Sequence, residues 1–192
     1  MKRIQILPLG SLNPEIVPNL AGQLSGEFGI PCEALPAEVA PLFAFNVTRQ
    51  QYSSTEILAW LMKRGTPDTW RLLGVTSLDL YIPILTFVFG EAQLKGTCAV
   101  VSTHRLSQEF YGLSQDGGLL NERLLKESVH ELGHTLGLQH CEDYQCVMAP
   151  SHGVEWIDLK SSRFCRDCRD SVPSRAAVKT LSVNPFLPDE KN

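Results

Sequence analysis

The residues with the clearest potential for chemistry form one stretch, His130 to His140, with the pattern HExxHxxGxxH. On a helix, residues i and i+4 lie on one face, so His130 and His134 can direct both imidazoles at one metal ion. Glu131 lies beside the first histidine, where its carboxylate can reach a metal-bound water. Gly137 can adopt a left-handed conformation at low cost, so the chain can turn back and bring His140 to the same ion. Three imidazoles and one water form the layout of a catalytic zinc.

The same histidine pair has a second interpretation, because two histidines on an apolar helix can be core residues held by hydrogen bonds alone. Glu131 argues against this interpretation, since burying the pair would also bury a carboxylate without a cation. A bare HExxH also arises by chance on solvated helices. The longer pattern fixes five positions, including a glycine where the geometry requires one, and therefore favours a metal site.

Four cysteines after the histidines have the spacing of metal ligands, C-x4-C and C-x-x-C. They are Cys141, Cys146, Cys165 and Cys168. Four thiolates satisfy tetrahedral zinc and leave no position for a substrate, so this site would be structural. Two disulfides are the alternative interpretation, which an oxidising compartment would favour. Cys32 and Cys98 lie in apolar surroundings, and we expect them to be small core residues.

Together, the histidine string and the four cysteines resemble the archaemetzincin family, a branch of the metzincin zinc peptidases. The resemblance is close from Val129 to Cys168 and extends over the first hundred residues only as a coarse pattern. It implies two Zn²⁺ ions per chain, a catalytic zinc at the three histidines and a structural zinc at the four cysteines. The interval from Met148 to Cys165 is one residue shorter than the family spacing.

The resemblance also implies a role for Met148. Metzincins place a methionine in a tight turn, the Met-turn, as an apolar floor beneath the zinc histidines. Met148-Ala149-Pro150 fits this description, and the alternative is an ordinary core methionine; in neither case is Met148 a ligand. His152 follows the turn, where it either assists substrate binding or is a surface loop residue.

The reaction that the resemblance implies is hydrolysis of a peptide bond. Glu131 would assist the attack of a zinc-bound water and then pass the proton to the leaving amine. The partner would be a peptide or protein substrate, bound extended along an edge strand within residues 87–101. The alternatives are a zinc-stabilised protein that binds a peptide or partner with little or no turnover, and a regulatory protein that uses the four-cysteine site for an interaction. Glu131 favours the enzyme, and the sequence leaves endopeptidase and aminopeptidase activity equally open.

Composition narrows the class of protein further. The 192 residues are 43% hydrophobic, which is enough for one domain with a core. A net charge of −4 gives no electrostatic case for binding nucleic acid or an anionic membrane. Basic residues near the end, among them Lys160, alternate with aspartates and predict a mixed solvated face. Pro8 and Gly10 interrupt the apolar start of the chain and no run reaches the length of a membrane span, so we expect a cytoplasmic monomer.

Strands and helices must position these groups, and their patterns alternate along the first half of the chain. The predicted strands are 4–9, 32–39, 70–76, 87–89 and 97–101, and the predicted helices are 13–28 and 53–65. Ser53 and Glu56 have the spacing of a capping box at the start of the second helix. The fold class that follows is α/β (α+β), a minimal metzincin-like domain with a mixed twisted sheet backed by helices.

The helix that carries the histidines is expected to begin near Leu119 to Asn121, after a linker-like stretch at residues 115–118. Its leucines would face the core, and the histidines would face the cleft. We expect residues 1–140 to form an N-terminal metzincin-like subdomain that includes this active-site helix. Residues 141–192 would form a small C-terminal subdomain with the Met-turn and the four-cysteine zinc site.

Overall fold

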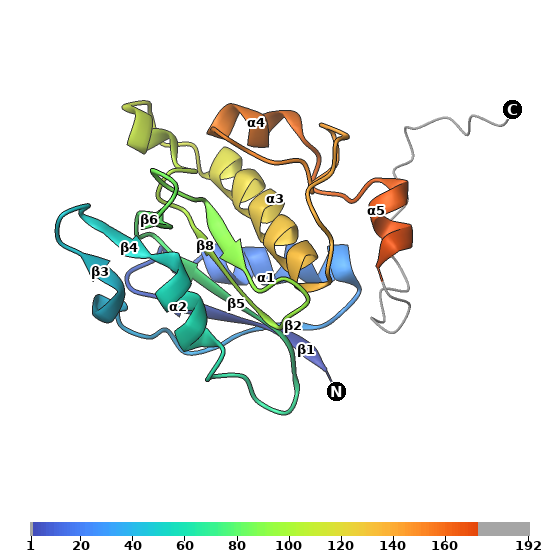
Figure 1. The fold of residues 1–192 in the computed structure, drawn as a ribbon, viewed down its shortest axis with the longest axis horizontal. Helices are drawn as coiled ribbons and strands as arrows, with labels where there is room; N and C mark the ends of the chain where they lie inside the picture. Colours follow the sequence, from blue (N-terminus) through green and yellow to red (C-terminus); the bar gives the residue numbers. More distant parts are fainter. Residues whose placement is uncertain (1, 173–192) are drawn as a thin grey trace, which may run out of the picture.

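A five-stranded sheet with strand order β2-β1-β5-β8-β7 forms the centre of the molecule in the computed structural model, which describes residues 2–172 (Figure 1). The end of the predicted C-terminal subdomain, residues 173–192, lies outside the described residues. The strands are β1 (Arg3–Leu9), β2 (Cys32–Ala34), β5 (Thr69–Thr76), β7 (Gly90–Ala92) and β8 (Cys98–Ser102). The first four strands in this order pair in parallel, and β7 runs antiparallel to β8 at one edge. The sheet is therefore mixed, as the sequence predicts.

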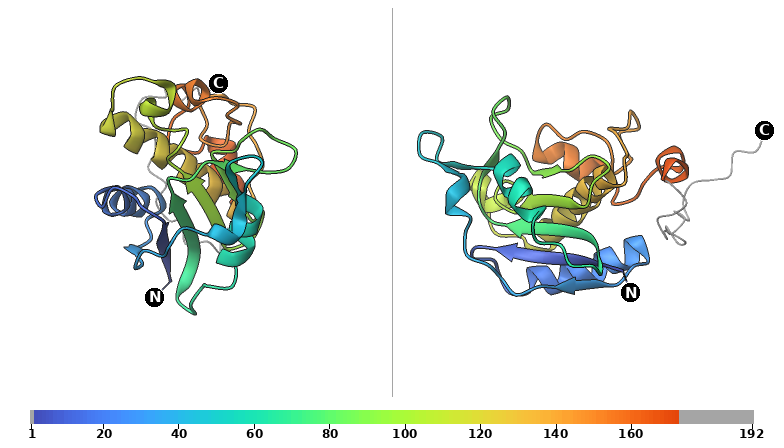
Figure 2. Two further views of the ribbon diagram at one scale, coloured as in Figure 1. Left: turned by 90° about the vertical axis from the view of Figure 1, so that its left-hand side faces the viewer. Right: turned by 60° about the horizontal axis from the view of Figure 1, so that its bottom comes forward.

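Helices cover both faces of this sheet, so the fold has three layers (Figure 2). Helices α1 (Ile16–Phe28) and α3 (Gly117–Thr135) share one core with Ile6 and Leu73, whereas α2 (Ser54–Leu61) shares another with Leu7 and Leu72. Successive strand residues point to opposite faces, which is why continuous apolar runs supply both cores. The two α-helices on one side thus fix the face on which the histidine pattern lies.

Shorter elements complete the described chain. They are β3 (Phe45–Asn46), β4 (Gln51–Ser53), β6 (Leu80–Tyr81), the 3₁₀ helices η1 (Leu42–Ala44) and η2 (Gln108–Tyr111), α4 (Val154–Leu159) and α5 (Arg166–Ser171). Strands β3, β4 and β6 form a second, three-stranded sheet. Strands of two or three residues are too short to show the alternation from which strands are predicted, so the sequence did not indicate this sheet.

The edge strand β7 lies a few residues later than predicted, at Gly90–Ala92 rather than 87–89. Val88 instead forms an isolated bridge with Leu80 of the second sheet, and Phe89 is buried in the main core. The apolar triplet therefore packs inward, while a segment of small and polar residues pairs with β8. The edge strand is therefore residues 90–92 rather than 87–89, and it lies beside α3.

The starts of two helices show how local side-chain contacts set their bounds. Asp116 caps α3 by accepting a hydrogen bond from the backbone N–H of Leu119 at 2.9 Å, so the predicted linker at 115–118 is the start of the helix. Ser53 caps α2 through the N–H of Glu56 at 3.3 Å, as predicted. Within the described residues, no helix is both long and apolar enough to cross a membrane.

Candidate metal centres and the active-site cleft

The C-terminal half of α3 holds His130 and His134 in fixed orientations. The Nδ1 atom of His130 lies 2.8 Å from the carbonyl oxygen of Val147, and that of His134 lies 2.8 Å from the carbonyl oxygen of Leu138. A carbonyl oxygen only accepts hydrogen bonds, so each neutral imidazole carries its proton on Nδ1 and has a lone pair on Nε2. The two Nε2 atoms lie 3.1 Å apart, so two lone pairs meet there.

This donor set fits a zinc ion. Two nitrogen atoms at zinc bonding distance in a tetrahedral site lie about 3.3 Å apart, close to the separation of the two Nε2 atoms. Gly137 has a φ of 97°, a conformation that favours glycine, and there the chain turns away from the axis of α3. The turn returns His140 to the pair, and ligand atoms from the three histidines all lie within 4.8 Å of one another. The structure therefore brings together all three predicted histidines.

Burial and nearby charge set the protonation of these groups. Burial, and then the positive charge of Lys160, lower the pKa of His130 well below its ordinary value, and burial also lowers the pKa of His134. Neutral imidazole is the form that binds a metal, so the cluster is ready for one. Burial, and then the negative charge of Glu127, raise the pKa of Glu131 well above its ordinary value.

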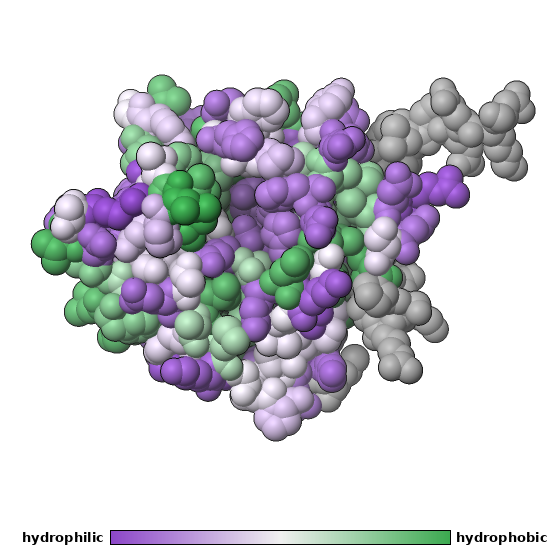
Figure 3. Space-filling view, viewed as in Figure 1, coloured by the Kyte–Doolittle hydropathy of each residue, from purple (hydrophilic) through white to green (hydrophobic). Residues whose placement is uncertain are grey.

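Glu131 lies in a cleft of about 390 Å³ between α3 and the edge strand β7. The cleft is lined by Gly90, Glu91, Ala92, Leu94, His130, Glu131, His134, Gln139 and His140. Hydrophilic residues gather around a hollow over this part of α3 (Figure 3). Gly90 approaches Glu131 closely, because a Cβ atom there would lie 2.8 Å from Cγ of Glu131 and 2.7 Å from the carbonyl oxygen of Val100. The catalytic candidate thus shares one cleft with all three histidines and an edge strand.

Met148 lies directly against α3, in the segment that the sequence predicts to be a Met-turn. The side chain is fully buried, and its Sδ lies 2.4 Å from the position that a Cβ on Gly133 would occupy. Only a glycine at this position allows so close an approach. The neighbouring Val147 supplies the carbonyl oxygen that holds His130. The segment therefore packs beneath the histidines.

The four predicted cysteine ligands also converge. Their sulfur atoms all lie within 4.8 Å of one another, and the Sγ atoms of Cys141 and Cys165 are 3.8 Å apart. Two sulfur atoms bound to one tetrahedral zinc are separated by about 3.8 Å, whereas a disulfide bond measures about 2 Å. The backbone N–H groups of Met148 and Cys165 donate to Sγ of Cys146 at 3.4 and 3.3 Å. All four cysteines are free thiols, and their geometry fits zinc rather than two disulfides.

The acidity of these thiols supports the same interpretation. Burial raises the pKa of Cys146 to about 11. Burial alone would also raise the pKa of Cys165, but hydrogen bonds from its neighbours outweigh burial and lower this pKa. A thiolate that forms here lies against further sulfur atoms, so the full set of four thiolates requires a cation. Cys32 and Cys98 lie outside this cluster, and burial raises the pKa of each, as is usual for core cysteines.

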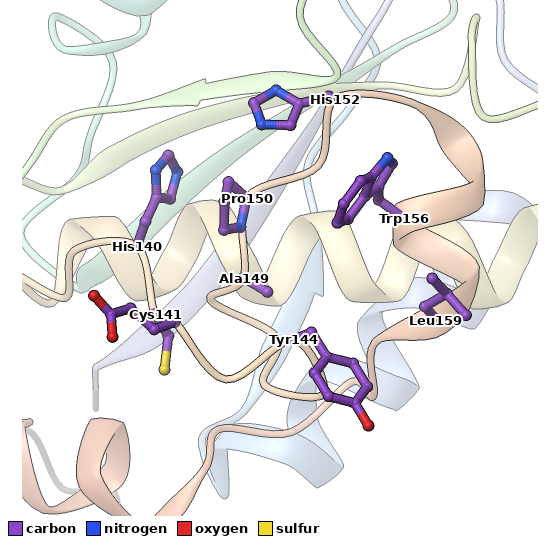
Figure 4. A pocket seen from close by; sticks show the side chains of 9 residues that line it. His140, Cys141, Tyr144, Ala149, Pro150, His152, Trp156 and Leu159 are labelled. Carbon is purple, nitrogen blue, oxygen red and sulfur yellow. The ribbon is translucent and has the colours of Figure 1, made fainter.

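An apolar pocket of about 500 Å³ opens beside His140 (Figure 4). It is lined by His140, Cys141, Glu142, Tyr144, Ala149, Pro150, His152, Trp156 and Leu159. The ring of His152 lies 6.1 Å from that of Trp156, at the upper end of the pocket in the view of Figure 4. Because His140 lines both the cleft and this pocket, the two spaces are neighbours. His152 is thus placed where a substrate could reach it.

Two residues at the site, Lys160 and Glu91, were not predicted correctly from the sequence. Lys160 is 2% exposed and does not belong to the predicted solvated face. The alternating charges around it read as a surface pattern, and no sequence signal shows that its helix packs on α3. Glu91 lines the cleft, but its carboxylate already accepts hydrogen bonds from the hydroxyl groups of Ser54 and Thr55 at the start of α2.

Comparison with known proteins agrees with this geometry. The sequence model of peptidase family M54 matches residues 37–173. Together, the mixed sheet, the active-site helix and the three-histidine cluster define a zinc-dependent metallopeptidase. Because the family match covers more than half of the chain, the protein belongs to peptidase family M54, the family of the archaemetzincins. The resemblance seen in the sequence is confirmed.

Relatives cover nearly the whole chain. The archaemetzincin of Methanocaldococcus jannaschii is 43% identical over 174 residues, which are 90% of this chain and 94% of that protein. A zinc-dependent peptidase from Methanocorpusculum labreanum superposes with a TM-score of 0.81 at 29% identity, covering 88% of this chain and 100% of that chain. The archaemetzincin of Archaeoglobus fulgidus, solved in complex with malonate, gives a TM-score of 0.76 at 42% identity, with 88% and 98% covered.

Proposed function

We propose that this metallopeptidase hydrolyses peptide bonds with Glu131 as its general base, at a zinc ion held by His130, His134 and His140. The observation that carries the proposal is that the Nε2 atoms of His130 and His134, each with a lone pair, lie 3.1 Å apart in the cleft that also contains Glu131. Facing lone pairs repel each other unless a cation lies between them. A carboxylate in the same cleft is unnecessary for holding the ion and is suited to moving a proton.

The chemistry follows from the position of Glu131 in the cleft beside the three histidines. A zinc ion bound by the histidines supplies a Lewis acid and lowers the pKa of a bound water to about 7. The carboxylate of Glu131 accepts one proton from the attacking water as the water oxygen bonds to the scissile carbonyl carbon. The carboxyl group holds this proton until the C–N bond breaks. Glu131 then donates it to the leaving nitrogen and returns to its starting charge.

The substrate would bind as an extended peptide along β7. This strand pairs with β8 on one side, and its residues 90–92 line the cleft. An edge strand offers unpaired main-chain N–H and C=O groups, to which a peptide can add as a further strand. A side chain next to the scissile bond would then enter the apolar pocket beside His140, so substrates with a bulky apolar residue at that position should be preferred.

A second zinc ion completes the proposal, held by Cys141, Cys146, Cys165 and Cys168. Their sulfur separations leave no space for a substrate once a tetrahedral ion is bound. The ion would join the segment around Met148 to α5. The protein would therefore hold two ions per chain, one for catalysis and one for architecture.

Substitution of the proposed base tests the function. Glu131→Gln keeps the size of the side chain but cannot accept the proton, so kcat should fall by about 10²- to 10⁴-fold. The measurement is hydrolysis of a peptide library followed by mass spectrometry, with elemental analysis of zinc in each protein. Glu122→Gln, which changes a largely exposed carboxylate on the same helix, is the matched control and should keep full activity.

Two results would contradict the proposal. Full turnover by Glu131→Gln would remove Glu131 from the mechanism. A single zinc per chain, lost when the cysteines are replaced but kept when the histidines are replaced, would instead favour a zinc-stabilised binding protein without turnover.

A further inference from the structure

A buried ion pair lies beneath the active site. The Nζ atom of Lys160, at the end of α4, lies 2.8 Å from Oε1 of Glu127 on α3, and the two side chains are 0% and 4% exposed. The same Nζ atom donates a hydrogen bond to the carbonyl oxygen of Ala149 at 3.2 Å. Lys160 therefore connects three segments, namely α4, α3 and the segment that contains Met148.

The contact to Ala149 is the last of three consecutive contacts between this segment and α3. Val147 accepts the hydrogen bond from Nδ1 of His130, and Met148 packs against Gly133. Ala149 is then joined to α3 through Lys160 and Glu127. The first two contacts are made by residues of the histidine motif and of the turn. The third depends on Lys160, which belongs to neither.

The position of Glu127 decides what this third contact can influence. Glu127 precedes His130 by three residues and Glu131 by four, so on a helix it lies one turn below both. A shift of the Ala149 carbonyl would also move Val147, two residues away, and with it the acceptor that orients the His130 imidazole. The partner of a metal-binding histidine fixes its ring orientation and its basicity.

We propose that Lys160 is a positioning residue of the active site, whose ion pair with Glu127 fixes the Met-turn segment against the metal-binding half of α3. This inference rests on the proposed function, because it takes the three histidines as the zinc site. A buried ion pair is weak grounds for stability, since well-packed apolar residues of similar volume often stabilise as much. Lys160 also donates a hydrogen bond to the carbonyl oxygen of Ala149, however, and so fixes a segment that orients a metal-binding histidine.

The test compares two lysines that both join α3 to α4. Lys160→Met removes the contact to Ala149 and leaves Glu127 unpaired, and Glu127→Gln with Lys160→Met removes both charges. Lys126→Met is the matched control, because Lys126 is 4% exposed and contacts Glu122 at 2.6 Å and the carbonyl oxygen of Asp158 at 3.4 Å, away from the Met-turn. For each full-length protein, zinc affinity of the histidine site is measured by competition with a chelator, and Tm by calorimetry.

We expect the double variant to recover most of the Tm that Lys160→Met loses, because no unpaired charge stays buried. Its zinc affinity at the histidine site should still be about tenfold or more below that of the wild-type protein, as is typical when the partner of a ligand is lost. The Lys126→Met protein should keep the wild-type affinity whatever its Tm.

Wild-type affinity in the double variant would overturn the inference, as would an equal loss of affinity in Lys126→Met. These outcomes leave the proposed function intact. A wild-type protein that binds zinc only at its cysteines would instead contradict the proposed function itself.

Discussion

At the scale of single residues, Gly90 leaves room in the cleft because it has no side chain. A Cβ atom at Gly90 would lie 2.8 Å from Cγ of Glu131 and 2.7 Å from the backbone oxygen of Val100, so β7 passes very close to this side chain. The glutamate can move aside, but the backbone of the paired strand cannot move without breaking β7 from β8. Gly90 thus determines where the carboxylate of Glu131 can lie.

Gly90→Ala should therefore lower kcat/KM strongly while lowering the free energy of unfolding only moderately. Displacement of a catalytic group by about 1 Å can cost about 100-fold in rate, whereas overpacking costs about 1–3 kcal/mol of unfolding free energy. The measurements are kcat/KM on one peptide and urea denaturation. Gly26→Ala is the control, since a Cβ there has nothing within 4 Å. Equal activity of the two variants would show that Gly90 does not constrain Glu131.

The residues that could be predicted from the sequence are those whose chemistry depends on spacing along the chain. His130 and His134 lie on one helical face and Cys165 and Cys168 on one turn, so the pattern indicates their common target. Gly90 and Lys160 owe their roles to contacts across the fold, which no local pattern encodes. Lys160 is the clearest case, because its charged neighbours in the sequence suggested a solvated face.

At the scale of elements, a polar pair holds the loops at the carboxyl ends of the strands. Arg105, after β8, donates two hydrogen bonds to the carboxylate of Asp79, between β5 and β6, at 2.6 and 2.8 Å, and Gln51 donates a third at 2.9 Å. Burial alone would raise the pKa of Asp79, but these hydrogen bonds outweigh it and lower the pKa below its ordinary value. The pair thus joins the two sheets.

The sign of this shift predicts a pH dependence of stability. Because the pKa of Asp79 is lower in the folded state, its contribution is complete above the unfolded-state pKa of about 3.9 and is lost as pH falls through the folded-state pKa. Asp79→Asn should lower the unfolding free energy at pH 7 by about 1–3 kcal/mol, and the difference from wild type should shrink below about pH 4. Urea denaturation between pH 3 and 7 measures this. Asp170→Asn, in an exposed ion pair with Arg166, should follow the wild-type curve, and a pH-independent difference for Asp79→Asn would refute the assignment.

The helix α4 supplies the wall of the apolar pocket through Trp156. Trp156→Ala should raise KM for peptides with a bulky apolar side chain by about tenfold or more, because an aromatic contact surface is lost, and should change KM little for peptides with alanine there. Steady-state kinetics on such a pair of peptides separates the two effects. Phe43→Ala removes an exposed aromatic residue outside the pocket and serves as control. A uniform change for both peptides would mean that the pocket does not select side chains.

At the scale of the whole molecule, one apolar core joins segments on both sides of the predicted subdomain boundary at residue 140. The ring of Phe164 lies 6.2 Å from that of Phe28 on α1, and Ile157 on α4 belongs to the same core. A subdomain boundary at residue 140 therefore stays a prediction, namely that the segment after it can unfold separately from the sheet. If a zinc ion at the four cysteines fastens the C-terminal segment, its loss should loosen that segment while the sheet persists.

Removal of one thiolate tests this expectation. Structural zinc contributes about 10 kcal/mol or more in small zinc modules, but this chain also has a large apolar core. Cys168→Ser should lose one zinc per chain and show faster hydrogen exchange across residues 141–172, with β1, β5 and β8 still protected. Cys32→Ser, outside the cluster, should keep two ions. Faster exchange throughout the sheet would mean that the segment is not a separate unit of stability.

A single peptide bond separates the two proposed metal centres, because Cys141 follows His140 directly. An ion bound by the thiolates would restrict the conformations open to His140. Binding of a second ion at the histidines would then cost the chain less conformational entropy. By thermodynamic linkage, an ion at the histidines must raise the zinc affinity of the thiolates by the same factor. Zinc uptake by the metal-free protein should therefore be cooperative, with half-loaded molecules rarer than for two independent sites.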